Sequence, residues 1–125
     1  MMAWQYFSAT ELTCHCGCGQ QHMQADFMQR LIQLREACNF PLPVTSGYRC
    51  ANHPEEKKKT TPGAHHLGWA VDIRCRGTQA HIVLRQALTL GFTGVGIKQK
   101  GNTRFIHLDT APATAMRPRP WIWSY

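Results

Sequence analysis

Among the histidines and carboxylates of this chain, three residues form a candidate set of ligands for a catalytic metal ion: His65, Asp72 and His107. His65 and Asp72 lie close together in the sequence, whereas His107 belongs to a separate apolar segment. Two imidazoles and one carboxylate hold Zn²⁺ and leave one coordination position for water, unlike the closed sites of structural zinc. A lone histidine is more often an ordinary surface or core residue, so the combination of the three carries the prediction. We therefore predict a zinc hydrolase.

The segments that would position these residues have the patterns of one α+β domain over residues 1–125. Apolar residues at helical spacing predict two main helices, over residues 23–38 and 78–90. Alternating or β-branched segments predict the strands of a small antiparallel sheet, at residues 42–46, 69–74, 94–98 and 104–110. Asp72 and His107 would then each lie on a strand of this sheet.

Two further segments lie outside these elements: residues 47–62 and residues 111–125. Residues 47–62 are polar, and we expect the charged run at residues 55–59 to be a solvated loop. The proline-rich residues 111–120 would wrap the surface before an edge strand at residues 121–125. The aromatic side chains of Trp121, Trp123 and Tyr125 either cover the core or form, with Arg117 and Arg119, a sugar- or peptide-stacking surface beside the cleft.

Charge and length restrict the classes of protein that fit. Fourteen Lys and Arg residues against seven Asp and Glu residues give a net charge of +7, which favours anionic partners. No stretch has the length of a membrane-spanning helix, and the first six residues lack the regions of a signal peptide. We therefore expect cytoplasmic synthesis, with the six cysteines mostly reduced thiols or metal ligands.

Three motifs resemble a known family in both order and spacing: Ser46-Gly47-Tyr48-Arg49, His65-x-x-Gly68-x-Ala70-x-Asp72-Ile73, and Phe105-Ile106-His107-x-Asp109. The family is peptidase M15, whose zinc peptidases cleave bacterial cell-wall peptides. The small single-domain forms of phages and prophages resemble this chain most.

This resemblance implies a fold, an activity and the roles of four residues. The fold would be that of hedgehog and D-Ala-D-Ala peptidases. The activity would be that of a D-Ala-D-Ala carboxypeptidase or an L-Ala-D-Glu endopeptidase, and the sequence does not distinguish them. His65, Asp72 and His107 would be the zinc ligands, and Arg49 would hold the substrate near the scissile carbonyl.

The general base is where the sequence departs from the family pattern. Some relatives carry a carboxylate three residues before the last zinc histidine, or a histidine two before it; here these positions are Arg104 and Phe105. Asp109 lies two residues beyond His107 on the same strand face, so it could orient a ligand imidazole or a metal-bound water. A turn-capping role for Asp109 is the alternative. Weaker candidates for the base are His53, Glu55, Glu56 and His66.

Cys14, Cys16 and Cys18 form a second unusual segment. Their single-residue spacing places alternate cysteines on one face of an extended strand, unlike the two-residue loop of a zinc knuckle. We therefore favour partly buried thiols beneath the helix at residues 23–38 over a second, structural metal at Cys14, Cys16 and Cys18. Cys50 either pairs or co-ligates with one of these cysteines, or simply packs.

These observations together predict zinc-dependent hydrolysis of peptide bonds in peptidoglycan stem peptides, as in a phage endolysin. Peptidoglycan peptides would be the partner, with neither nucleic acid nor membrane, and the protein would be a monomer. We expect cytoplasmic synthesis without a signal peptide and action on the cell wall after release. Nucleic-acid zinc modules use closed cysteine-rich sites, so the His65, Asp72 and His107 set does not fit them. The alternative is a catalytically silent protein on the same fold that binds wall peptides or serves in a phage particle.

Overall fold

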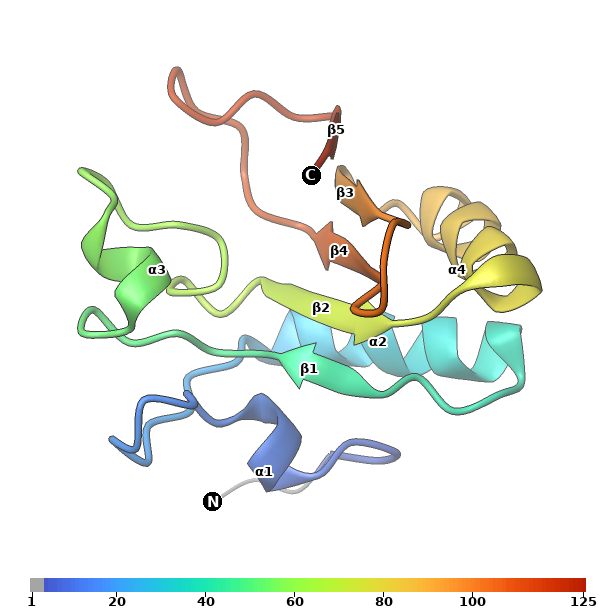
Figure 1. Cartoon of the computed structure of the whole chain (residues 1–125), viewed down its shortest axis with the longest axis horizontal. Helices are drawn as coiled ribbons and strands as arrows, with labels where there is room; N and C mark the ends of the chain where they lie inside the picture. The colour runs from blue at the N-terminus through green and yellow to red at the C-terminus, as the bar shows by residue number, and fades with distance from the viewer. Residues whose placement is uncertain (1–3) are drawn as a thin grey trace.

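A sheet lies at the centre of the molecule (Figure 1), and its strands carry two of the three candidate ligands, Asp72 and His107. The computed structural model describes residues 4–125. Its five strands lie in the order β1-β2-β4-β3-β5. In chain order the strands are β1 (Val44–Ser46), β2 (Ala70–Arg74), β3 (Gly94–Lys98), β4 (Phe105–Asp109) and β5 (Trp121–Ser124).

The direction of β5 makes the sheet mixed. The pairs β1–β2, β2–β4 and β3–β4 are antiparallel, whereas β5 runs parallel to β3. Gly94 at the start of β3 pairs with both Asp109 at the end of β4 and Trp121 at the start of β5. Residues 110–120 therefore connect β4 to β5 at one end of the sheet, so β5 runs opposite to β4 and along β3. The α+β class is confirmed, and only the expectation of a wholly antiparallel sheet needs correction.

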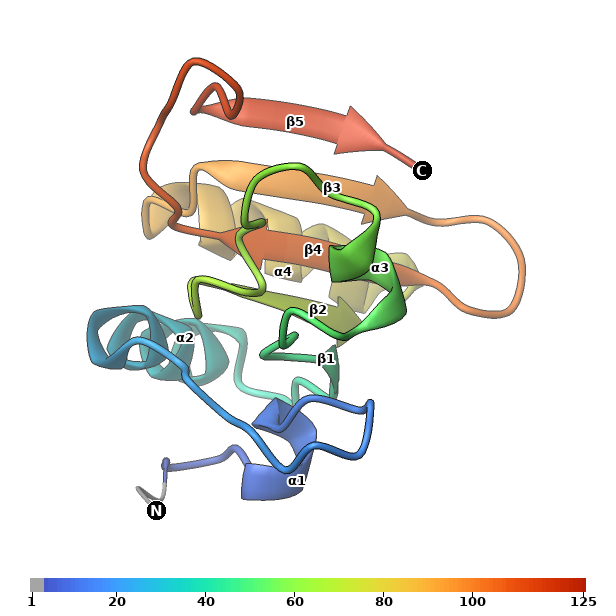
Figure 2. The same cartoon turned by 90° about the vertical axis from the view of Figure 1, so that its left-hand side faces the viewer.

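Two long helices lie where the hydrophobic periodicity predicts them. They are α2 (Ala25–Cys38) and α4 (Gly77–Thr89), which contact each other. Alternation along β2 directs Val71 and Ile73 into the same core as these helices, and both are fully buried. The other face of β2 carries Asp72, and Figure 2 shows α4 behind the sheet and the short helix α3 (Pro54–Lys57) in front of it.

Two short helices were not predicted, and one of them overturns the interpretation of residues 55–59 as a solvated loop. α1 spans Ala9–Leu12, and α3 spans Pro54–Lys57. The His53 side chain caps α3 by accepting a hydrogen bond from the backbone N–H of Glu55, and Pro54 suits the first turn. Glu56 is buried, with Oε1 accepting from the Gly63 N–H at 2.9 Å. The helix thus holds the segment that leads to His65.

No helix within residues 4–125 is long and apolar enough to cross a membrane.

Candidate metal centre

Strand register brings Asp72 and His107 together. The two residues are direct partners across the antiparallel β2–β4 pair, so their side chains lie side by side on one face. Paired residues on adjacent strands have Cβ atoms roughly 5 Å apart, which suits a carboxylate and an imidazole that bind one metal ion together. Asp72 and His107 are both buried.

His65 arrives from the turn that precedes β2. Gly68 in this turn has a φ of +81°, and a Cβ there would overlap the carbonyl oxygen of His22. A left-handed backbone in so close an approach favours glycine. The backbone N–H of Arg49 donates to the His65 carbonyl at 3.3 Å, which ties the turn to the segment after β1.

The candidate ligand atoms form a nearly equilateral triangle. His65 Nε2 lies 3.2 Å from His107 Nδ1 and 3.3 Å from Asp72 Oδ1, and His107 Nδ1 lies 3.2 Å from Asp72 Oδ1. In a tetrahedral site with zinc–ligand bonds of about 2.0–2.1 Å, ligand atoms lie about 3.3 Å apart. The three atoms therefore fit three corners of a zinc tetrahedron.

Hydrogen bonds on the far side of each imidazole aim its lone pair at this triangle. His65 Nδ1 is 2.8 Å from the Gly47 carbonyl oxygen, which can only accept, so Nδ1 carries the proton. His107 Nε2 is 2.6 Å from Asp109 Oδ2, and we assign the second proton there by the same reasoning. His65 Nε2 and His107 Nδ1 are then unprotonated and face the Asp72 carboxylate. Three electron-rich atoms that converge in this way match the chemistry of a cation site.

Asp109 links the triangle to the C-terminal segment. Arg119 holds its carboxylate with two hydrogen bonds, from Nε to Oδ1 at 2.9 Å and from Nη2 to Oδ2 at 2.8 Å. Asp109 is fully buried. Burial alone would raise its pKa, but the hydrogen bonds from His107 and Arg119 outweigh it and lower the pKa of Asp109 to about 2. Oδ1 also accepts from the Ala111 N–H at 3.2 Å, so Asp109 contacts both the imidazole and the following turn.

Arg49 lies on the other oxygen of Asp72. Its Nη2 donates to Asp72 Oδ2 at 3.1 Å, and its Nε donates to Ser46 Oγ at 3.0 Å. Burial opposes ionisation of Asp72, but in the metal-free site hydrogen bonds from His107 and His65, when the nitrogens that face Asp72 carry protons, lower its pKa well below the ordinary range. Asp72 therefore stays charged at neutral pH, as a metal ligand must.

The two imidazoles respond differently to this environment. Burial lowers the pKa of His65. For His107 burial acts in the same direction, but hydrogen bonds with Asp109 and Asp72 outweigh it and raise the pKa. The carboxylates of Asp72 and Asp109 lie on the two sides of the His107 imidazole and favour positive charge there. A metal ion at the triangle would supply positive charge beside Asp72.

A cleft of about 520 Å³ opens beside the triangle. His65 and His107 line it, together with Trp123 and Tyr125. The Trp123 ring packs on His107 with ring centroids 4.9 Å apart. Five cationic residues share the lining: Arg49, Lys58, Lys59, Arg117 and Arg119. Among residues 4–125, no aspartate or glutamate lines the cleft.

The weaker candidates for a general base have other contacts. His66 Nδ1 contacts the Arg49 carbonyl at 2.9 Å, and Glu55 pairs with Lys58 on the surface. His53 and Glu56 hold α3 and Gly63, as described above. None of these four side chains belongs to the ligand triangle.

The sequence left the roles of two residues of the site open. Arg119 and Trp123 were candidates for a stacking surface beside the cleft, with covering of the core as the more ordinary role, and the structure places both in the cleft lining. Neither position carries a local signal, because the contacts with Asp109 and His107 arise only when β5 joins the sheet. Asp109 itself was detectable, because its two-residue spacing from His107 places both on one face of β4.

A small α+β domain in which a sheet and the turn before one of its strands present two imidazoles and a carboxylate beside an open cleft has the architecture of a zinc peptidase. The model of the family described as Peptidase M15 matches residues 5–109, so the chain belongs to the peptidase M15 family. No curated protein matches the chain. The resemblance of the three motifs is thereby confirmed, and family membership implies a zinc metallopeptidase. Arg119, Trp123 and Tyr125 lie beyond the range that the family model matches.

Proposed function

We propose that this protein hydrolyses peptide bonds in peptidoglycan stem peptides, with zinc held by His65, Asp72 and His107. The observation that carries the proposal is the triangle of ligand atoms, with sides of 3.2–3.3 Å, beside an open cationic cleft. When bound, zinc lowers the pKa of water and polarises a substrate carbonyl. The protein's own residues must then place the peptide and handle protons.

Arg49 is the residue best placed to hold the substrate. It lines the cleft and lies next to the triangle, because its Nη2 donates to Asp72 Oδ2. A guanidinium there can stabilise a developing oxyanion or hold a substrate carboxylate. Its bond to Ser46 Oγ restrains the side chain in the direction of the site.

The charge of the cleft supports an anionic peptide as substrate. Lys58, Lys59, Arg117 and Arg119 add to the positive charge of Arg49 along the lining. A D-Ala-D-Ala terminus ends in a carboxylate, and the D-Glu of an L-Ala-D-Glu bond carries one. Both bonds therefore have an anion beside the scissile carbonyl, and the cleft favours encounter with either.

Asp109 acts in this scheme as a positioning residue for His107. Its bonds to Arg119 occupy both carboxylate oxygens, and a pKa of about 2 makes it a poor proton acceptor at neutral pH. Tyr125 lines the cleft, and burial raises the pKa of its phenol. The phenol therefore keeps its proton and can donate a hydrogen bond to the substrate.

One observation favours a second function. Because no carboxylate among residues 4–125 lines the cleft, the familiar general base of zinc peptidases has no counterpart there. A catalytically silent protein that binds wall peptides through the same cleft is the alternative.

Digestion of purified peptidoglycan, followed by mass spectrometry of the fragments, tests these functions. Released D-Ala identifies a carboxypeptidase, and cleavage after L-Ala identifies an endopeptidase. Co-sedimentation with peptidoglycan without any new fragment would overturn hydrolysis and support the silent binder. The His65→Ala variant should lose both zinc and activity, whereas the exposed His81→Ala variant should keep both.

We also infer that the protein works as a monomer on the wall after release from the cell. The net charge of +7 supports both parts of this inference, because it attracts the protein to an anionic wall polymer and makes copies of the chain repel one another. Light scattering of the purified protein gives the mass in solution, and a dimer would contradict it.

A further inference from the structure

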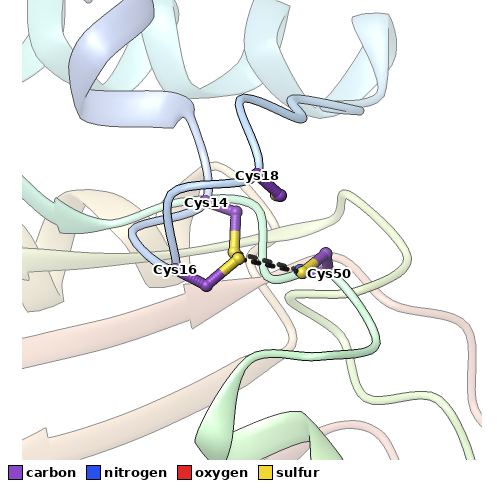
Figure 3. A group of neighbouring side chains, drawn as sticks. All are labelled: Cys14, Cys16, Cys18 and Cys50. Carbon is purple, nitrogen blue, oxygen red and sulfur yellow. Dashed lines mark hydrogen bonds between the residues drawn. The ribbon is translucent and has the colours of Figure 1, made fainter.

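A second group of metal-binding side chains lies apart from the His65 triangle. Figure 3 shows a group of four cysteines at the turn of residues 15–18, called the N-terminal turn below: Cys14, Cys16, Cys18 and Cys50. Their four sulfur atoms all lie within 4.8 Å of one another, and none of the four is in a disulfide. Cys16 Sγ and Cys50 Sγ lie 3.3 Å apart. Cys50 joins from a segment more than thirty residues along the chain.

The backbone around these cysteines corrects the expectation of an extended strand. Residues 15–18 form a turn, with Gly17 at a φ of +93° and Gly19 at +75°. The Cys14 N–H donates to the Gln20 carbonyl at 2.9 Å and closes the loop. A closed turn with two left-handed glycines directs alternate side chains to one centre, which a flat strand of the same spacing would not do.

Burial contradicts the expectation that these thiols simply pack beneath a helix. Cys14 and Cys50 are buried beside Tyr48, but Cys16 and Cys18 are exposed. Apolar packing accounts for a buried thiol and gives no reason to place two exposed thiols against it. The exposed side also leaves a path by which an ion can enter.

The dimensions suit a tetrahedral ion bound by sulfur. Zinc–sulfur bonds of about 2.3 Å place the four sulfurs of such a site about 3.8 Å apart. This separation lies between the 3.3 Å distance from Cys16 Sγ to Cys50 Sγ and the 4.8 Å limit for the whole group. Small adjustments of exposed side chains would therefore complete the tetrahedron.

Backbone N–H groups already point at two of the sulfurs. The Cys50 N–H donates to Cys14 Sγ at 3.3 Å, and the Gln20 N–H donates to Cys18 Sγ at 3.4 Å. Such bonds stabilise negative charge on sulfur and orient it toward a metal. Four sulfurs around one centre, with no histidine or carboxylate in the group, select zinc as a closed structural site.

We propose that Cys14, Cys16, Cys18 and Cys50 bind a second, structural zinc ion that fixes the N-terminal turn to the segment carrying Arg49. In the segment that carries Arg49, the Gly47 carbonyl contacts His65 Nδ1 and the Arg49 guanidinium donates to Asp72. The Tyr48 N–H between them donates to the Leu12 carbonyl at 3.0 Å. The ion would therefore hold in place the backbone that orients the other metal centre.

Zinc analysis of the purified full chain tests the proposal. Wild-type protein should contain about two zinc ions per chain and the Cys16→Ser/Cys18→Ser variant about one. Both cysteines are exposed, so the double substitution does not disturb the core. The matched control removes two buried cysteines outside the cluster, Cys38→Ala/Cys75→Ala, and should keep both ions. Equal zinc content in wild type and the Cys16/Cys18 variant would overturn the proposal.

Cobalt substitution separates this site from the His65 centre. Cobalt(II) bound by thiolates absorbs strongly in the near ultraviolet, whereas a site of imidazoles and a carboxylate lacks this thiolate band. The band should persist in the His65→Ala variant and disappear in the Cys16→Ser/Cys18→Ser variant. A proposed catalytic centre that failed to bind metal would leave the thiolate band intact, so the two proposals fail separately. A disulfide between Cys16 and Cys50 in the wild-type protein, identified by peptide mapping and a loss of two mass units, would also overturn the structural zinc.

Discussion

The Arg119→Met substitution tests how much the centre depends on the C-terminal segment. Arg119 is the cation that neutralises Asp109: its Nη2 donates to the same Oδ2 that contacts His107, and Asp109 is fully buried. At 2.8 Å between Nη2 and Oδ2, and an effective dielectric constant of about 20, the Coulomb attraction is about 6 kcal/mol. Desolvation offsets part of this attraction, and loss of one partner from a buried pair typically costs 3–5 kcal/mol. Methionine keeps the apolar stem, so the charge is what the substitution removes.

We expect Arg119→Met to lower the free energy of unfolding by about 3–5 kcal/mol, measured by denaturant titration in a chelator so that bound metal does not contribute. For a chain of this length the same change lowers the melting temperature by roughly 10–20 °C. Arg117→Met is the matched control, because within residues 4–125 the Arg117 guanidinium donates to the carbonyls of Pro112 and Pro62 and pairs with no carboxylate. This control should change stability by less than about 0.5 kcal/mol.

A double variant shows whether the uncompensated charge causes the loss. Asp109→Asn removes the charge that Arg119→Met leaves buried, so the Asp109→Asn/Arg119→Met protein should recover part of the lost stability. If Arg119→Met unfolds like Arg117→Met, or if the double variant shows no coupling, the linkage of Arg119 to the centre through Asp109 is refuted.

Three further substitutions and conditions follow from the structure. A Cβ at Gly94 would overlap the Asp109 carboxylate, so Gly94→Ala should cost about 1–3 kcal/mol of stability and weaken zinc binding in a competition titration; unchanged affinity would argue against the orienting role of Asp109. Leu31→Ala in the fully buried core should cost about 2–5 kcal/mol in denaturant titration, whereas Leu88→Ala, at half-exposed Leu88, should stay within about 0.5 kcal/mol. Asp109 has a pKa of about 2 in the folded chain against an ordinary value of 3.8, so the unfolded chain binds more protons in this range and stability falls as pH drops from about 4 to 2. The metal-free wild type should lose about 2 kcal/mol more across this range than Asp109→Asn, and parallel pH profiles would contradict the pKa assignment.

Local patterns in the sequence were sufficient to predict much of the scaffold and to single out the candidate ligands. The helical periodicity of residues 23–38 and 78–90 predicted α2 and α4, because an amphipathic helix shows its buried face directly in its spacing. Strand alternation placed His107 and Asp109 on one face of β4, and the three motifs indicated the peptidase family that the comparison confirms. These features depend on residues a few positions apart, or on residue types that perform one kind of chemistry.

Contacts between distant segments had no such signal. The β2–β4 register, which sets Asp72 opposite His107, depends on which strands pair. Short helix α3 was missed because its residues are polar and charged, and its stability comes from the cap at His53 and the buried contact of Glu56.

Two features of the site itself also required the folded chain. Arg119 reaches Asp109 only because the proline-rich segment returns β5 to the edge of the sheet beside β3. Cys50 meets the cysteines of the N-terminal turn because the chain after β1 passes that turn, which two left-handed glycines close. Residue types and short spacings thus specify which groups can bind a metal. The meeting of groups tens of residues apart depends on how strands pair and loops close, and these outcomes minimise the free energy of the whole chain and leave no periodic pattern in the sequence.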